Sequence, residues 1–262
     1  MEKRLFFTVT PGRSGTNYLA ELLHGIPGIT ALHEPEPNFV HVLRRVQQDP
    51  TVAHAFLRDH KLPAISKVET PAYLETSHLT CKGFIEPLLR LGMAPGLIIL
   101  RRPPREVAWS LLERRTVPAR TPAGMAYLLE PRDPYVLPLP GWERLSDYHL
   151  CFWYALEIER RQLRYTQMAA ELGLPVVDLT NRELNALPVF AEVLAVLGIE
   201  ATDQVRARHA QVSGKVHNPN SVRQQPPDNL DELENDVWNR VADFEPLLAG
   251  KISERYARGT AV

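Results

Sequence analysis

The sequence has few cysteines, no long apolar run and no excess of charge of either sign. Its two cysteines, Cys81 and Cys151, lie far apart and outside any Cys-x-x-Cys spacing, which excludes a disulfide framework. No stretch approaches the ~18 apolar residues of a membrane helix. The apolar run at residues 5–9 is too short for a signal-peptide core. We therefore expect a cytoplasmic protein with reduced thiols and no membrane contact.

The charge balance argues against wholesale binding to nucleic acid. Lys and Arg total 30 and Asp and Glu total 31, which gives a formal net charge of -1. Nucleic-acid binding usually requires a basic excess. The 262 residues are 44% hydrophobic, enough to bury one large core. Any anion site must therefore be found from the positions of basic residues.

Short apolar runs alternate with longer helical patterns along the chain. The runs lie at residues 5–9, 29–32, 79–83, 96–100 and 175–178. Strands separated by helices predict βαβ units and a mainly parallel sheet. The expected fold is a single α/β domain over residues 1–262, with helices on both faces of the sheet and a P-loop-like turn after the first strand.

Three segments interrupt this alternation. Residues 117–142 contain six prolines, which exclude regular helix or central strand and indicate a lid. A long helix is expected at residues 147–172, with Ser146 as its N-cap. Residues 211–229 are polar and turn-rich, and an amphipathic helix should follow.

The first strand leads into the glycine-rich segment Thr-Pro-Gly-Arg-Ser-Gly-Thr-Asn at residues 10–17. A turn of this kind presents backbone N–H groups and the positive end of a helix to an anion. Its arginine adds a fixed charge and its hydroxyls add donors. The predicted phosphate contacts are Gly12, Arg13, Ser14, Gly15, Thr16 and Asn17.

This turn differs from the phosphate loop of nucleotide kinases. That loop requires Gly-Lys-[Ser/Thr], where Lys contacts phosphate and the hydroxyl contacts Mg²⁺. Here Gly15 is followed by Thr16 and Asn17, and the strand at 96–100 ends in Arg101 and Arg102 rather than an acidic residue. The pattern indicates phosphate bound by protein cations, with no metal expected.

A second anion site is predicted where the strand at 96–100 ends. Arg102 is followed by Pro103 and Pro104, which suit the first turn of a helix. Ser110 falls about two turns inside that helix. At ~1.5 Å rise per residue, Arg102 and Ser110 can contact one phosphate that lies along the helix flank.

Together these segments resemble the nucleotide-binding signatures of the sulfotransferases that use 3′-phosphoadenosine-5′-phosphosulfate (PAPS). Residues 11–17 resemble the 5′-phosphosulfate loop, and Arg102 with Ser110 resembles the 3′-phosphate site. His33-Glu34-Pro35 is similar to the Glu-Pro segment of the bacterial and carbohydrate branch. Residues 215–221 resemble the polar loop before the last helix. The resemblance spans residues 5–244.

Two positions depart from the aryl and steroid branch of that family. Arg13 stands where that branch usually has Lys, and Arg there matches the carbohydrate branch. The aryl branch's catalytic Lys-Thr-His strand is represented only by Lys82, in Thr-Cys-Lys-Gly at residues 80–83. The Arg-Lys-Gly signature of that branch is absent.

The resemblance implies transfer of a sulfuryl group from PAPS to a hydroxyl, or less favourably an amine, of a small metabolite or carbohydrate. The desulfated nucleotide PAP is then the product. The implied catalytic residues are Arg13 on the phosphosulfate, Lys82 on the bridging oxygen, Glu34 as general base and His33 as its alternative. Two other functions stay open at this point: an ATP-dependent kinase and a non-catalytic nucleotide-binding protein. The sequence does not identify the acceptor or the oligomeric state.

Overall fold

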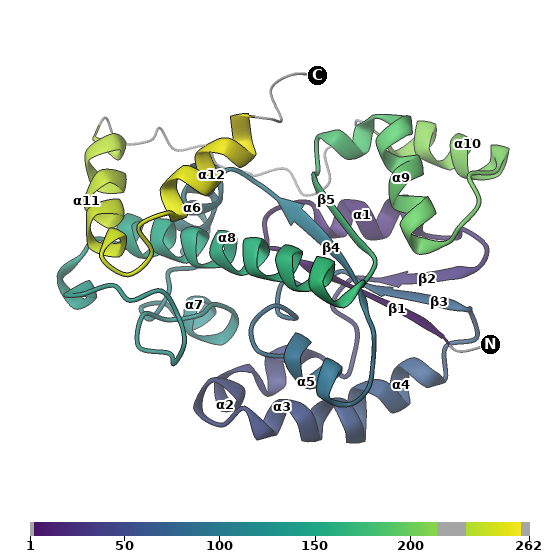
Figure 1. The fold of residues 1–262 in the computed structure, drawn as a ribbon, viewed down its shortest axis with the longest axis horizontal. Coiled ribbons are helices and arrows are strands. Elements are labelled where there is room, and N and C mark those ends of the chain that lie inside the picture. The colour runs from purple at the N-terminus through teal and green to yellow at the C-terminus, as the bar shows by residue number, and fades with distance from the viewer. Residues whose placement is uncertain (1–2, 214–228, 258–262) are drawn as a thin grey trace. The chain divides into compact units, whose positions relative to one another are not determined.

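The computed structural model describes residues 3–213 and 229–257, which form two compact units (Figure 1). The first unit contains the described residues of 1–102 and 161–219, and the second contains those of 103–160 and 220–262. The helix α8 (Asp147–Leu172) contributes residues to both.

The first unit contains a parallel sheet of five strands. The strands are β1 (Arg4–Val9), β2 (Ile29–Leu32), β3 (Ala72–Glu75), β4 (Gly96–Arg101) and β5 (Val176–Thr180), in the spatial order β2-β3-β1-β4-β5. The predicted α/β class with a parallel central sheet flanked by helices is confirmed. Because β1 lies between β3 and β4, the segments that follow these three strands meet at one edge of the sheet.

Alternate residues of β1 enter two different apolar clusters. Phe6 packs with residues of α1 (Thr16–Leu23), α9 (Leu187–Leu197) and α10 (Asp203–Val212). Phe7 packs with residues of the helices on the other side. Those helices are α2 (Leu43–Gln48), α3 (Thr51–Phe56), η2 (Leu57–Lys61), α4 (Leu62–Ser66) and α5 (Ile85–Arg90). Figure 1 shows the two groups of helices on opposite faces of the sheet.

The prediction of a strand at residues 79–83 is wrong. These residues form a turn before α5, in which Lys82 N–H donates to the Leu79 carbonyl at 2.9 Å and Gly83 has φ +104°. Residues 79–82 are all fully buried, so the turn matches the burial of a core strand. The strand that pairs with β1 on this side is β3, which ends four residues upstream of Leu79.

The second unit is helical. It contains α6 (Pro104–Glu113), α7 (Pro122–Tyr127), η3 (Trp142–Arg144), α11 (Leu230–Ala242), α12 (Leu248–Ala257) and the first part of α8. The long helix predicted at 147–172 is confirmed, and Ser146 Oγ accepts the His149 N–H at 3.5 Å as an N-cap does.

The proline-rich segment at 117–142 is partly regular, contrary to expectation. Pro122 occupies the first turn of α7, where its missing N–H costs nothing, and Thr121 caps that helix. Trp153 Nε1 of α8 donates to the Leu137 carbonyl at 2.8 Å, which anchors the segment within this unit. Its function as a lid stays a prediction.

Residues 215–221, which resemble the family's polar loop, lie outside the described residues. Across residues 3–213 and 229–257, no helix combines the length and the apolar character that crossing a bilayer requires.

Candidate functional site

The turn between β1 and α1 has the backbone conformation of an anion-binding loop. Gly12, Arg13 and Gly15 all have positive φ, of +78°, +58° and +90°. Successive residues of this kind turn backbone N–H groups towards a common centre. Ser14 is fully buried and its Oγ donates to the Gly12 carbonyl at 3.0 Å, which stabilises the turn. Thr16, also buried, begins α1, so the helix N-terminus faces the turn.

Both glycines of the turn are closely approached by other segments. A Cβ added at Gly15 would lie 2.7 Å from Asn181 Cβ, in the segment after β5. One added at Gly12 would lie 3.2 Å from His78 Cγ, in the segment after β3. The turn is therefore approached by the segments that follow β3 and β5, which lie on opposite sides of β1 in the sheet. Asn17 lies exposed at the start of α1.

The two adjacent arginines at the end of β4 have different partners. Arg101 Nε lies 2.5 Å from Asp178 Oδ1 of β5, and its Nη2 lies 3.8 Å from Glu183. Arg102 Nη1 donates to the Arg13 carbonyl at 2.7 Å. Arg102 therefore contacts the turn between β1 and α1, whereas Arg101 is paired with carboxylates.

Ser110 is buried in α6 and belongs to the second unit. Arg102 belongs to the first unit. The prediction that these two residues share one phosphate stays a prediction.

Three side chains form a polar chain beside the turn. Lys82 Nζ lies 2.9 Å from His78 Nδ1, and His78 Nε2 lies 3.4 Å from Glu34 Oε1. Lys82 is fully buried, and Glu34 and His78 are largely covered. The structure thus brings together two of the predicted catalytic residues, Glu34 and Lys82, through a histidine that sequence reasoning missed.

Burial controls the ionisation of this chain. It lowers the pKa of Lys82 to about 7, an effect that nearby Cys81 and Glu34 partly oppose. Burial, followed by the positive charges of Lys82, His33 and Arg13, holds the pKa of His78 well below its usual value. At neutral pH His78 is therefore a neutral imidazole, and Lys82 is about half protonated, so that its charge responds to its neighbours.

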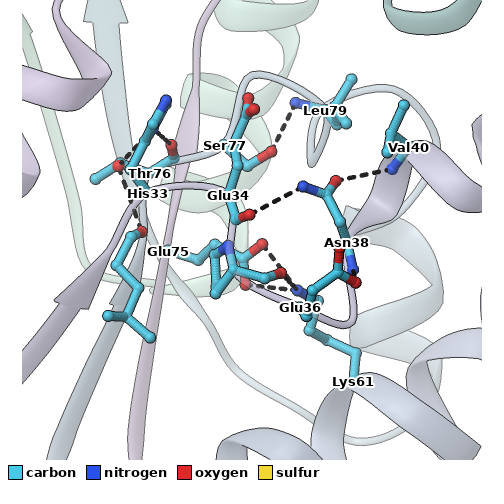
Figure 2. Close-up of polar contacts among 12 residues, drawn as sticks. His33, Glu34, Glu36, Asn38, Val40, Lys61, Glu75, Thr76, Ser77 and Leu79 are labelled. Carbon is cyan, nitrogen blue, oxygen red and sulfur yellow. Dashed lines mark hydrogen bonds and ion pairs between the residues drawn. The ribbon is translucent and has the colours of Figure 1, made fainter.

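His33, the alternative base, faces the backbone rather than the turn. Its Nδ1 lies 2.7 Å from the Thr76 carbonyl and 3.2 Å from Thr76 Oγ1, as Figure 2 shows. This contact links the residue after β2 to the residue after β3. The role of His33 as an alternative base stays a prediction, and His78 is a histidine that approaches Gly12 of the turn.

His78 was missed because of the misplaced strand. The resemblance places the catalytic strand at Lys82, whereas the end of β3 is followed by Thr76, Ser77 and His78. Thr8 Oγ1 of β1 donates to the Ser77 carbonyl at 3.0 Å, which holds this segment against the central strand. A histidine three residues after an apolar run was the available signal.

The described residues contain no group of three or more His, Cys, Asp or Glu side chains that could hold a metal ion. Three cationic side chains lie in or beside the turn between β1 and α1. Arg13 belongs to the turn, Arg102 donates to the Arg13 carbonyl, and Lys82 contacts His78.

No protein-family model and no curated protein matches the chain. Solved structures do share its fold, and two of them are sulfotransferases. The mouse sulfotransferase SULT7A1 complexed with PAP has a TM-score of 0.53 at 13% identity, over 97% of this chain and 89% of that one. The sulfotransferase domain from the curacin biosynthetic pathway has a TM-score of 0.54 at 13% identity, over 97% and 98%. The chain therefore has the sulfotransferase fold along nearly its whole length.

Proposed function

We propose that this protein is a PAPS-dependent sulfotransferase of the bacterial or carbohydrate type. It moves a sulfuryl group to a hydroxyl of a small metabolite or carbohydrate, with an amine as the less favoured acceptor. The observation that carries this proposal is the polar chain Lys82–His78–Glu34 beside a cationic phosphate turn. The fold shared with sulfotransferases, one of them complexed with PAP, supports it.

Sulfuryl transfer needs a base on one side of the sulfur and cations on the other. The acceptor oxygen forms a bond to sulfur, the bond from sulfur to the bridging phosphate oxygen breaks, and negative charge grows on that oxygen. Arg13 and the N–H groups of the turn suit this charge, and the Lys82 ammonium suits the bridging oxygen. The acceptor proton passes to the Glu34 carboxylate.

His78 connects the two charged residues of this mechanism. A protonated Lys82 donates to His78 Nδ1, so the ring proton lies on Nε2 and faces Glu34 Oε1 at 3.4 Å. The imidazole thus orients the carboxylate, and burial holds the pKa of His78 well below its usual value. PAPS and the acceptor are the ligands implied, and no metal takes part in the proposal.

Calorimetry of the nucleotide tests the donor assignment. We expect PAP to bind without metal and more tightly than AMP, because Arg102 contacts the additional 3′-phosphate. Arg102→Ala should weaken PAP binding by about tenfold or more, since a charge-assisted hydrogen bond contributes roughly 1.5–3 kcal/mol. Arg206→Ala, on exposed α10, is the matched control and should change nothing. Equal affinity for PAP and AMP contradicts the assignment, and a requirement for ATP with Mg²⁺ indicates the kinase instead.

Substitution of the base tests the chemistry. Glu34→Gln keeps the shape of the side chain and removes its basicity, so kcat should fall by roughly 10²-fold or more while PAP affinity stays unchanged. Glu192→Gln is the matched control, because Glu192 is exposed on α9. Turnover near the wild-type value in Glu34→Gln, measured as transfer of labelled sulfate, contradicts the role of Glu34.

A further inference from the structure

An ion pair is buried in the apolar core below the segment that carries Glu34. Lys61 Nζ lies 2.9 and 3.0 Å from the two carboxylate oxygens of Glu75, and the two side chains are 1% and 0% exposed. Tyr73 donates its hydroxyl to Glu75 at 2.9 Å, and the Lys61 ammonium lies 4.4 Å from the Phe39 ring centre. Burial raises the pKa of Glu75 to about 7, although Lys61 opposes the shift.

Stability alone does not account for this pair. Removing two charges from water costs several kcal/mol per ion, and apolar residues of similar volume often replace a buried ion pair without loss. The surroundings are apolar and aromatic, and include Phe39, Leu57 and Tyr73. A buried ion pair in such surroundings is better explained by a role in holding the groups that it contacts in place.

Lys61 makes a third contact, to the segment that carries the proposed base. Its Nζ donates to the Pro35 carbonyl at 3.3 Å. One residue earlier, Glu34 has φ +46°, a conformation that costs about 1–3 kcal/mol in a residue other than glycine and persists only where the surroundings impose it. Asn38 Nδ2 donates to the Glu34 carbonyl at 2.9 Å. Two consecutive carbonyls, those of Glu34 and Pro35, are therefore held by side chains (Figure 2).

The other end of the pair is fixed in the sheet. Glu75 is the last residue of β3 and is paired with Leu32 of β2 and Phe7 of β1. Lys61 is the last residue of the π-helical segment η2, a type of distortion found often at functional sites. The pair thus connects a strand of fixed position to the strained segment at residues 34–38.

We propose that Lys61 and Glu75 are positioning residues, which hold the Glu34 segment so that its carboxylate faces His78 and the acceptor. This inference rests on the proposed function. It assigns no chemical step to the pair, whose polar contacts are to each other, to Tyr73 and to the Pro35 carbonyl. Loss of the ion pair should lower the transfer rate strongly, since a misplacement of about 1 Å can lower a rate by 10²-fold.

A mutant cycle tests the inference. The double substitution Lys61→Met with Glu75→Gln removes both charges and keeps the volumes. We expect kcat to fall by about 10- to 100-fold, with the KM for PAPS and the Kd for PAP unchanged. In a Glu34→Gln background the same double substitution should change kcat by less than about twofold, because the residue that it positions is already inactive. A loss of equal size in both backgrounds overturns the proposal.

Hydrogen–deuterium exchange supplies a readout that does not depend on transfer. Peptides covering residues 33–42 should exchange faster in the double variant, whereas peptides covering residues 10–23 should not. Arg208→Met is the matched control, since it removes the ion pair with Glu21 between α10 and α1 and should alter neither kcat nor exchange at 33–42. If the wild-type protein transfers no sulfate, the proposed function fails and exchange alone decides the positioning role. Unchanged exchange at 33–42 in the double variant overturns that role.

Discussion

Lys82 is a fully buried lysine whose charge depends on what occupies the neighbouring turn. Burial lowers the pKa of Lys82 to about 7, so most molecules carry a neutral amine at pH ~8. A bound phosphate favours the ammonium and raises this pKa. We expect PAP binding at pH ~8 to take up close to one proton, measured by calorimetry in buffers of different ionisation enthalpy.

The control for this uptake is a lysine outside the site. Lys82→Met should abolish the uptake, whereas Lys67→Met, at an exposed position after α4, should leave it intact. PAP binding that releases protons, or that shows the same uptake in Lys82→Met, contradicts the assignment.

The turn after β1 could be predicted from sequence because its conformation is favoured locally. Two glycines between a strand and a helix allow positive φ at little cost, and Gly12 and Gly15 have it. The role of His78 could not be predicted, since its approach to Gly12 depends on the pairing of β3 with β1. The resemblance named Arg102 for the second anion site, but the pairing of Arg101 with Asp178 could not be predicted, because the two residues are 77 positions apart.

At the scale of elements, the turn between β1 and α1 depends on the space around Gly15. An alanine there would carry its Cβ 2.7 Å from Asn181 Cβ and would have to keep φ +90°. Both the backbone strain and the contact oppose the native turn. We expect Gly15→Ala to weaken PAP binding by about tenfold or more and to lower the urea concentration at the unfolding midpoint.

Gly92→Ala separates the effect of backbone strain from the effect of the contact with Asn181. Gly92 follows α5 with φ +78°, and an added Cβ there would meet nothing within 4 Å. This variant should lose a similar amount of stability from strain and bind PAP as the wild type does. Weaker PAP binding in Gly92→Ala would mean that the loss in Gly15→Ala reflects general destabilisation.

Strands were predicted correctly where a continuous apolar run marks them. The buried turn at residues 79–83 was predicted as a strand in place of β3. Four of the five strands coincide with predicted runs to within two residues at each end. β3 has only four residues and ends in Glu75, whose buried charge is satisfied by Lys61 at a distance of fourteen residues. In a sequence, a carboxylate is typical of an exposed residue unless its partner is known. The strand β3 was therefore not predicted.

At the scale of the whole molecule, the alternation of strands and helices predicts a parallel sheet but not the order of its strands. Order depends on pairing between segments far apart, such as Phe7 with Glu75 and Thr8 with Ile98. That order brings the segments carrying Glu34 and His78 to the turn after β1. The fold class was therefore predictable from the sequence, whereas only some of the residues that form the candidate site were.

The buried charge of Lys82 should also be visible in the stability of the protein. Its folded pKa of about 7 lies below the ordinary value of 10.5 that applies to the unfolded chain. Between these two pH values the unfolded chain holds a proton that the folded chain lacks. Unfolding then takes up a proton, so the free energy of unfolding should rise with pH across this window, by at most about 1.4 kcal/mol per pH unit from this residue. Below pH ~7 both states are protonated, and the cost of the buried ammonium is then constant.

Urea denaturation of the wild type and of Lys82→Met, at intervals between pH ~6 and ~9.5, measures this contribution as a difference. Methionine has a similar volume and no charge, so the variant should be the more stable protein at pH ~6, by an amount that shrinks steadily as the pH rises from about 7. Groups that titrate alike in both proteins cancel in the difference, which is why the difference is the quantity to follow. Lys67→Met, the exposed control, should give a difference that does not depend on pH. A flat difference for Lys82→Met would mean that Lys82 keeps its ordinary affinity for a proton in the folded state, and its burial would then have to be compensated by an anion already in place.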